Sequence, residues 1–187
     1  LLDKHQSFNG KAKERFTNYK EQPLEWNMLP DFTGKLAQYG LNPDRREKSG
    51  VRAAIIREKG TNGEREMAYM LYLAGFDVKD VMMTDLITGR ETLDDINFIV
   101  FCGGFSNSDV LGSAKGWAGA FLYNDKAKEA LDRFYARPDT LSLGVCNGCQ
   151  LMVELGLVGK VADNNCGKAK MLHNDSHKFE SNFVGVT

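Results

Sequence analysis

An alternation of apolar runs and helical patterns, which begins at Val51, is the feature that most constrains the fold. Four stretches predict strands and three predict helices: strands over 51–57, 76–83, 96–104 and 140–146, and helices over 63–75, 125–138 and 148–157. Strands that alternate with helices in this way form a parallel sheet with right-handed crossovers. We therefore expect an α/β fold with an open, mainly parallel sheet flanked by helices.

The first predicted helix, over 63–75, has recognisable ends. Asn62 is the expected N-cap, because an asparagine side chain accepts hydrogen bonds from the first free amides of a helix. Gly75 is the expected stop, because glycine adopts the left-handed conformation that ends many helices. The apolar face is predicted to consist of four residues at helical spacing: Met67, Met70, Leu71 and Ala74.

Residues 1–50 differ from the rest of the chain. The stretch 3–20 predicts a polar amphipathic helix, whose apolar residues are Phe8, Ala12, Phe16 and Tyr19. The remainder of the segment holds three of the four prolines and has no clear period. It predicts an extended linker, with Trp26, Leu29 and Phe32 as candidate anchors. We therefore divide the chain into a helix and linker over 1–50 and a domain over 51–187.

Composition excludes several classes of partner. The formal net charge is −1, so the chain has no excess of positive charge with which to bind nucleic acid or an anionic membrane. No apolar stretch approaches the roughly 20 residues that span a bilayer. Four cysteines in a chain of 187 residues are typical of reduced thiols and not of a disulfide framework. A cytoplasmic protein that binds neither nucleic acid nor membranes is the expectation.

The stretch "LSLGVCNGCQLM", residues 141–152, places a cysteine where a strand passes into a helix. Cys146 lies between Gly144 and Gly148, and a glycine-lined turn of this kind pushes the central side chain into the open. Glycine is favoured on both sides because the neighbouring backbone leaves no room for a Cβ atom. The positive end of the following helix favours the thiolate, which is the form that attacks a substrate. The pattern is therefore typical of a cysteine nucleophile.

Other interpretations of this cysteine remain open on the local sequence alone. It could be a buried structural thiol at a strand end, since free cysteine is often buried. A zinc site would need the set Cys146, Cys149, Cys166 and His173, whose spacing matches no familiar zinc finger. A redox C-x-x-C motif normally follows the first strand of its domain and not the fourth. The other three cysteines are expected to be packing residues: Cys149, Cys102 at a strand end and Cys166 in a loop.

Three motifs in order resemble one enzyme family. "GVCNGCQ" resembles the G-[hydrophobic]-C-x-G-x-Q signature of class I, triad-type glutamine amidotransferases. Together with "IREKGTNGEREMAYMLYLAGFDVKDVMMTDLITGR" and "FCGGFSNSDVLGSAKGWAGAFLYND", it is similar to the glutaminase domain of phosphoribosylformylglycinamidine synthases. The resemblance runs from about Val51 to the last residue. It implies a class I glutamine amidotransferase-like, flavodoxin-like sheet, and residues 1–50 then resemble the segment that follows the synthetase region in the large single-chain form.

The resemblance also implies an activity and a site. Cys146 would form a γ-glutamyl thioester with glutamine, and the ammonia released would serve the ATP-dependent conversion of formylglycinamide ribonucleotide to formylglycinamidine ribonucleotide in purine biosynthesis. Backbone amides of Gly104 and Asn147 would form the oxyanion hole. The glutamine pocket would include Gly103, Phe105 and Gln150.

The resemblance implies partners outside this chain. Glutamine would be its own substrate, while ATP and Mg²⁺ would bind the synthetase domain of the same parent protein, so no cofactor and no metal is expected here. No role follows for Asn107 or for the turn over 57–66, where Asn62, Glu64 and Arg65 are also consistent with a plain helix start. The alternatives are another cysteine hydrolase of the DJ-1/PfpI-like type, or a zinc-held interaction module without enzymatic activity.

The rest of the family's triad is not recognisable in this sequence. The family carries its base and the glutamate that orients it in an H-P-E motif, and none of His5, His173 and His177 is followed by Pro-Glu. Neither His173 nor His177 is therefore assigned as the base, and residues 171–187 are predicted to form a loop and a strand over 179–187. We expect an incomplete glutaminase domain that by itself turns over little glutamine.

Overall fold

The computed structural model describes residues 31, 33–158, 169–175, 177 and 179–181. The chain divides into two units, one over Lys35–Met171 and the other composed of Leu1–Gly34 and Leu172–Thr187. The described residues of the second unit contain no helix or strand, so the architecture is that of the first unit.

The central sheet is parallel throughout. Its four strands lie in the order β3-β1-β4-β6, and each neighbouring pair is parallel. Their bounds are β1 Arg52–Arg57, β3 Asp77–Met82, β4 Phe98–Phe101 and β6 Leu141–Gly144. Strand β1 lies inside the sheet, and β3, the next strand of this sheet along the chain, lies at its edge, as in the flavodoxin-like order. The predicted α/β fold with an open parallel sheet is confirmed.

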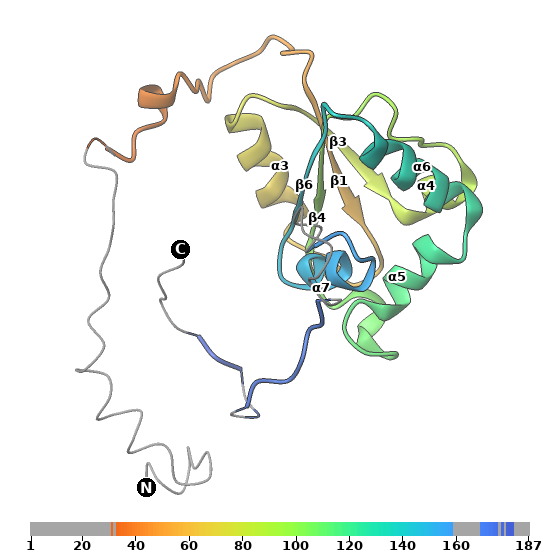
Figure 1. Cartoon of the computed structure of the whole chain (residues 1–187). Helices are drawn as coiled ribbons and strands as arrows, with labels where there is room; N and C mark the ends of the chain where they lie inside the picture. The colour runs from red at the N-terminus through yellow and green to blue at the C-terminus, as the bar shows by residue number, and fades with distance from the viewer. Residues whose placement is uncertain (1–30, 32, 159–168, 176, 178, 182–187) are drawn as a thin grey trace, which may run out of the picture. The chain divides into compact units, whose positions relative to one another are not determined.

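Helices cover both faces of this sheet (Figure 1). The α-helices are α3 Glu64–Leu73, α4 Met83–Thr88, α5 Lys115–Leu122, α6 Asp125–Ala136 and α7 Asn147–Glu154, with 3-10 helices η1 Leu36–Tyr39 and η2 Ser106–Asp109. Helix α3 packs on one face, and α4, α5, α6 and α7 contribute to the core on the other. Within the described part of the chain, no helix has the length and apolar character to span a bilayer.

Strand β1 shows why the core has two halves. Its alternate residues Ala53 and Ile55 join the apolar cluster beneath α3, while Ala54 and Ile56 join the larger cluster on the opposite face. All four are at most 1 % exposed, as expected for a central parallel strand that is covered on both sides.

Helix α3 departs from prediction at its start and along its face. Gly63 and not Asn62 is the N-cap, and the Asn62 side chain accepts a hydrogen bond from the Gly63 amide (2.8 Å). Met67 and Leu71 pack into the core as predicted, but Met70 is 57 % exposed and Ala74 is also exposed. The buried stripe of the helix runs through Met67, Ala68 and Leu71. Met70 and Ala74 lie to one side of this stripe and face solvent.

The end of α3 follows the prediction. The amide of Gly75, a residue with φ +100°, donates to Tyr72, and the Phe76 amide donates to Leu71 (both 3.0 Å). These two hydrogen bonds form a Schellman motif, in which glycine is favoured because the backbone is left-handed.

Three strand predictions extend too far. The predicted strand over 96–104 leaves the sheet after Phe101, and Gly103–Gly104 form a separate short strand, β5, which pairs antiparallel with β2 (Thr61–Asn62). The predicted strand over 76–83 ends at Met82, and α4 begins at Met83. The predicted strand over 140–146 ends at Gly144. Helices α4 and α5 were not predicted. The sequence of α5, "KGWAGAFL", is almost uniformly apolar and therefore lacks the amphipathic period of a surface helix.

Several predictions fall outside the described residues. They concern the helix over 3–20, the anchors Trp26, Leu29 and Phe32, and Cys166. Of the strand predicted over 179–187, the structure describes Phe179–Ser181, and these three residues are not in a strand. The described part of the predicted linker contains one 3-10 helix, η1.

Asp77, the first residue of β3, ties the end of the linker to the sheet. Its carboxylate accepts hydrogen bonds from the backbone amides of Ser49 (3.0 Å) and Gly50 (2.8 Å) and pairs with Arg45 (3.4 Å). The two amides, together with the nearby guanidinium, hold the pKa of Asp77 below its ordinary value of 3.8.

We expect the stability conferred by Asp77 to depend on pH. A carboxyl whose folded pKa is depressed stabilises the fold above its unfolded pKa, and this stabilisation is lost as pH falls through the folded value. Asp77→Asn should therefore lower the urea midpoint at pH 7, and the difference from wild type should shrink below pH of about 4. Asp132→Asn, a change on the exposed side of α6, is the control. A difference for Asp77→Asn that stays constant down to pH 3 would contradict this assignment.

Candidate active site

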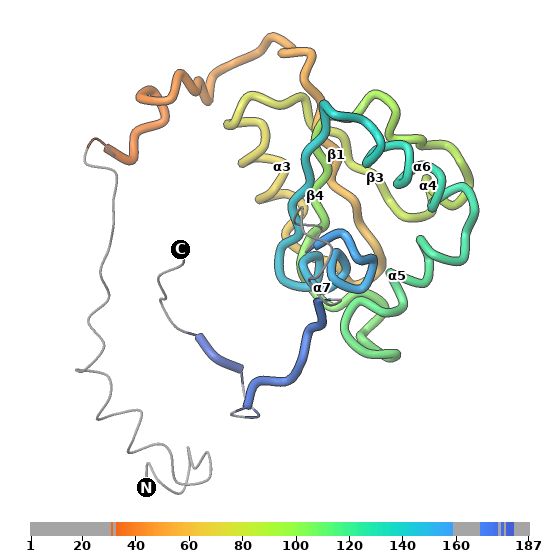
Figure 2. Tube along the Cα trace, viewed as in Figure 1, coloured from red at the N-terminus to blue at the C-terminus, as the bar shows by residue number. Residues whose placement is uncertain are grey.

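Three chain segments meet at the carboxyl-terminal edge of the sheet. The turn over 58–62 follows β1, the loop over 102–109 follows β4, and residues 145–146 connect β6 directly to α7. The tube in Figure 2 bends from the strand that Figure 1 labels β6 into α7. Because parallel strands end at the same edge, ligands of such sheets bind there.

Cys146 occupies a strained turn between β6 and α7. Its backbone angles are φ 53° and ψ −111°, outside the ordinary regions for a residue with a side chain. The turn is held by hydrogen bonds from the Val145 amide to Phe101 (3.1 Å) and from the Gly148 amide to Val145 (2.8 Å). Cys146 itself is exposed. The predicted elbow geometry is present, and strain of this kind is concentrated at functional sites.

The two glycines beside the cysteine are required by close backbone contacts. A Cβ atom on Gly148 would lie 2.0 Å from the carbonyl oxygen of Phe101. A Cβ atom on Gly144 would lie 2.6 Å from the carbonyl oxygen of Gly148. Helix α7 therefore packs directly on the ends of β4 and β6, which is possible only when both positions lack side chains.

The two glycine-marked strand ends lie close together. A Cβ atom on Gly103 would lie 3.1 Å from the Cβ and 3.9 Å from the Sγ of Cys146. The cysteine thus lies against the glycine pair of β5, and any larger residue at Gly103 would displace it.

The amide of Gly104 is directed away from β2. The Phe105 amide donates to the carbonyl of Gly60 (2.9 Å), so the next pair along this antiparallel ladder, Thr61 and Gly104, is of the kind that exchanges no hydrogen bonds. The Gly104 N–H is therefore left for an acceptor elsewhere. Phe105 uses its own amide in the ladder, and its side chain is 71 % exposed.

The turn over 58–62, which the sequence left without a role, supports this loop. The Asn107 amide donates to the carbonyl of Lys59 (2.7 Å), next to the bond that joins Phe105 to Gly60. Gly60 has φ +87°, and a Cβ atom there would lie 2.2 Å from the Phe105 carbonyl oxygen. A glycine in "EKGTNG" was the available signal, but only the tertiary contact shows what it permits.

Arg57, at the end of β1, links this strand to β3 and to the start of α3. Its guanidinium makes two hydrogen bonds of 2.7 Å to Asp80 and lies 3.7 Å from Glu64. The hydrogen bonds to Asp80 raise the pKa of Arg57 above its ordinary value. Glu64, whose role was open, is thus part of an ion-pair group that joins the start of α3 to the sheet.

Asn147 is the buried polar residue of the site. It is 1 % exposed, and its side chain accepts from the Ser106 amide (3.2 Å) and donates to Asp109 (3.3 Å) and Gln150 (3.0 Å). The structure therefore brings Asn147 and Gln150 together with the loop after β4. Asp109 was not anticipated, because nothing in its local sequence distinguishes it from a solvated loop carboxylate.

The remaining cysteines and histidines are arranged differently. Cys102 is buried, and this burial raises the pKa of its thiol to about 11; Cys149 is half-buried in α7. Among the described residues, no group of three or more His, Cys, Asp and Glu side chains could hold a metal ion. His173 and His177 belong to the other unit of the chain.

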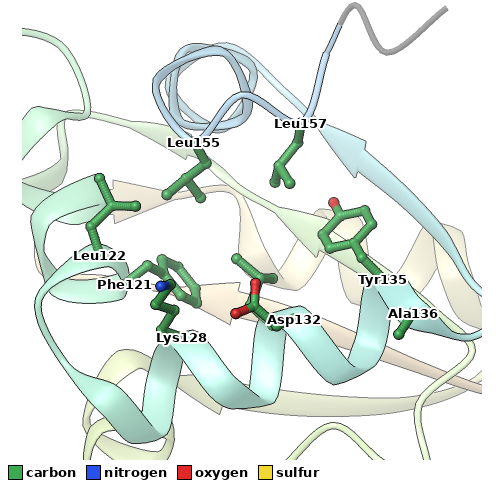
Figure 3. A pocket seen from close by; sticks show the side chains of 9 residues that line it. Phe121, Leu122, Lys128, Asp132, Tyr135, Ala136, Leu155 and Leu157 are labelled. Carbon is green, nitrogen blue, oxygen red and sulfur yellow. The ribbon is translucent and has the colours of Figure 1, made fainter.

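Two pockets of this unit each have a volume of about 450 Å³. One borders the loop after β4 and is lined by Glu58, Ser106, Asn107, Val110, Leu111, Gly112, Gly116 and Ala120. The other, shown in Figure 3, lies between α5, α6 and the end of α7, where Phe121, Leu155 and Leu157 line it. None of the predicted site residues lines either pocket, so the predicted glutamine site is assigned to neither.

Comparison with known proteins places the chain in a family. The sequence model of the CobB/CobQ-like glutamine amidotransferase domain matches residues 50–187. The chain belongs to this glutamine amidotransferase family. The match covers every segment of the site described above, and it favours neither the DJ-1/PfpI-like hydrolase nor the zinc-held module.

Curated relatives of this amidotransferase are much longer proteins. "Phosphoribosylformylglycinamidine synthase" of Homo sapiens is 49 % identical over 72 % of this chain and 11 % of its own length. "Probable phosphoribosylformylglycinamidine synthase" of Caenorhabditis elegans is 49 % identical over 90 % of this chain and 12 % of its own length. The chain thus spans about a tenth of these relatives.

Two further comparisons concern location and fold. A relative from Arabidopsis thaliana, 48 % identical over 73 % of this chain and 10 % of its own length, is named "Probable phosphoribosylformylglycinamidine synthase, chloroplastic/mitochondrial". The predicted cytoplasmic location therefore stays a prediction. "Structure of PurLQS from Thermotoga maritima" matches 58 % of this chain and 46 % of that chain, with 27 % identity and a TM-score of 0.46.

Proposed function

We propose that this chain is the glutamine-hydrolysing part of a phosphoribosylformylglycinamidine synthase, with Cys146 as its nucleophile. The observation that carries the proposal is the strained turn of Cys146 at the start of α7, held against Gly103. Membership of the amidotransferase family and the names of the relatives supply the substrate class.

The chemistry follows from the positions of the backbone groups. The Cys146 sulfur attacks the side-chain carbonyl carbon of glutamine, and the carbonyl oxygen becomes an oxyanion. The amides of Gly104 and Asn147 are proposed to donate to this oxyanion, and each such donor typically contributes about 10²–10³ in rate. Collapse of the tetrahedral intermediate expels ammonia and leaves the γ-glutamyl thioester, which water then hydrolyses to glutamate. Gly103, Phe105 and Gln150 are proposed to shape the glutamine pocket.

The proton transfers require a base that we do not assign within residues 1–187. The departing nitrogen must accept a proton before it can leave as ammonia, and deacylation needs an activated water. One group can serve both steps, first as an acid and then as a base. None of the three histidines of the chain is followed by Pro-Glu. We therefore keep the prediction that residues 1–187 by themselves release little glutamate.

The proposed partner is the synthetase part of the same parent protein. The matched region is only about a tenth of the named relatives' own length, which leaves ample sequence for that part. ATP, Mg²⁺ and the phosphorylated substrate are proposed to bind there, because the described residues offer no metal-holding group and the sequence has no phosphate-binding glycine loop. The location is proposed to be cytoplasmic.

Labelling with a glutamine analogue tests the proposal. We expect a diazo ketone that mimics glutamine to modify Cys146 in the full-length parent enzyme, as read by peptide mass spectrometry. Glutamine should protect this residue and asparagine should not, because the pocket must fit the longer side chain. Cys149→Ser should be labelled normally. Modification of other cysteines at the same rate, or protection by neither amino acid, would contradict the proposed function.

A further inference from the structure

We propose that the side chain of Asn147 is a positioning residue, which aligns the two halves of the oxyanion hole. The inference rests on the proposed function and extends it, because until this point only the backbone amide of Asn147 has had a role. The two proposed donors, the amides of Gly104 and Asn147, belong to different segments: the loop after β4 and the helix after β6.

The direct contact between these segments does not set the direction of an N–H group. Gly103 lies so close to Cys146 that a Cβ atom on it would be 3.1 Å from the Cys146 Cβ, but closeness between carbon atoms is not directional. The hydrogen bond from the Ser106 amide to Asn147 Oδ1 (3.2 Å) is directional and lies two residues beyond Gly104. It therefore fixes the loop that carries one donor to the residue that carries the other.

The other end of the Asn147 amide is held as well. Its Nδ2 donates to Asp109 Oδ1 (3.3 Å) and to Gln150 Oε1 (3.0 Å). The Ser106 amide is only a donor and the Asp109 carboxylate only an acceptor, so the orientation of the Asn147 side chain is unambiguous. The residue is 1 % exposed, and a buried network of this kind is worth most when every member is satisfied.

The loop has little freedom of its own. Asn107, Ser108 and Asp109 all have φ between 51° and 55°, a run of left-handed residues that costs energy and persists only where its surroundings impose it. The turn over 58–62 holds one side of this loop through Phe105 and Asn107. Asn147 holds the opposite side, so a change at Asn147 leaves the loop attached but shifts the Gly104 amide.

Asn147→Asp in the full-length parent enzyme tests this role. The new carboxylate keeps the acceptor for Ser106 but loses both donated hydrogen bonds and faces Asp109 at close range, where like charges repel. We expect glutaminase kcat to fall at least about tenfold, with KM for glutamine within about twofold, because oxyanion contacts act in the transition state. Modification of Cys146 by the diazo ketone should fall by a similar factor. Modification by iodoacetamide, which needs only an accessible thiolate, should stay within about twofold of wild type.

The reciprocal variant separates positioning from folding. In Asn147→Asp/Asp109→Asn the donor and acceptor exchange places, and Gln150 needs only to turn its amide, so we expect kcat within about threefold of wild type. Asn124→Asp, at the N-cap of α6 where the side chain only accepts a hydrogen bond, is the matched control and should be unaffected.

Each outcome decides between the proposals. Wild-type enzyme without glutamine-protected labelling overturns the proposed function and this inference together. If Asn147→Asp leaves the labelling of Cys146 by the diazo ketone at the wild-type rate, the inference alone is overturned. It is also overturned if the variant lowers the modification of Cys146 by the diazo ketone and by iodoacetamide to the same extent. If Asn147→Asp fails to fold, the double variant and Asp109→Asn decide, since a tenfold loss in the double variant contradicts the positioning role.

Discussion

Glutamine-dependent synthesis by the full-length parent enzyme should fall by about 10⁴-fold or more in Cys146→Ser, because removal of the nucleophile forfeits most of the rate enhancement of a nucleophile–base unit. The serine hydroxyl occupies the same turn but is a far weaker nucleophile at neutral pH than a thiol. Synthesis from added ammonium salt should stay within about twofold of wild type, because ammonia bypasses the thioester step. The measurement is the rate of product formation with each nitrogen source.

Cys149→Ser is the control for this experiment. Cys149 is three residues away in α7 and half-buried, and it has no proposed role in the reaction, so both rates should be retained. Equal loss of the glutamine-dependent and ammonia-dependent rates in Cys146→Ser would indicate a structural role for the cysteine. A glutamine-dependent rate within tenfold of wild type would remove Cys146 from the mechanism.

Gly148→Ala should destabilise the fold by about 3 kcal/mol, the upper part of the range for an overfilled interior. The added methyl group would lie 2.0 Å from the carbonyl oxygen of Phe101 and 2.8 Å from the Phe101 Cβ. Backbone cannot rotate away as a flexible side chain can, so α7 must move off the end of β4. Because domains are stable by only about 5–15 kcal/mol, this loss should be plain in a urea titration of the chain.

Gly119→Ala is the matched control for the glycine experiment. Gly119 also lies within a helix, α5, but a Cβ atom there would meet only the Tyr123 ring at 3.8 Å, an ordinary contact. Alanine is the better helix former by about 0.5–1 kcal/mol, so this variant should be slightly more stable than wild type. A stability loss in Gly148→Ala no greater than about 0.5 kcal/mol, within the usual range of surface changes, would show that α7 does not pack as described.

Local patterns along the chain were sufficient to predict the parallel sheet and the position of Cys146. Both depend on near neighbours in sequence: β-branched runs, helical periods and the glycine pair around the cysteine. The errors also have local causes. Helix α5 was missed because it is apolar on nearly every side, and β4 was drawn too long because the glycines after Phe101 continue an apolar run until they turn to pair with β2.

What the sequence by itself determined is the alternation of four parallel strands with helices and the nucleophile elbow, since turn geometry and periodicity are properties of short segments. Only the tertiary structure decided which distant groups support that elbow. Gly60 accommodates the Phe105 carbonyl, and Asn147 binds Ser106 and Asp109, across about 40 residues of chain in each case. Contacts of this kind leave no periodic trace, because they depend on how three parallel strands bring their carboxyl ends to one edge.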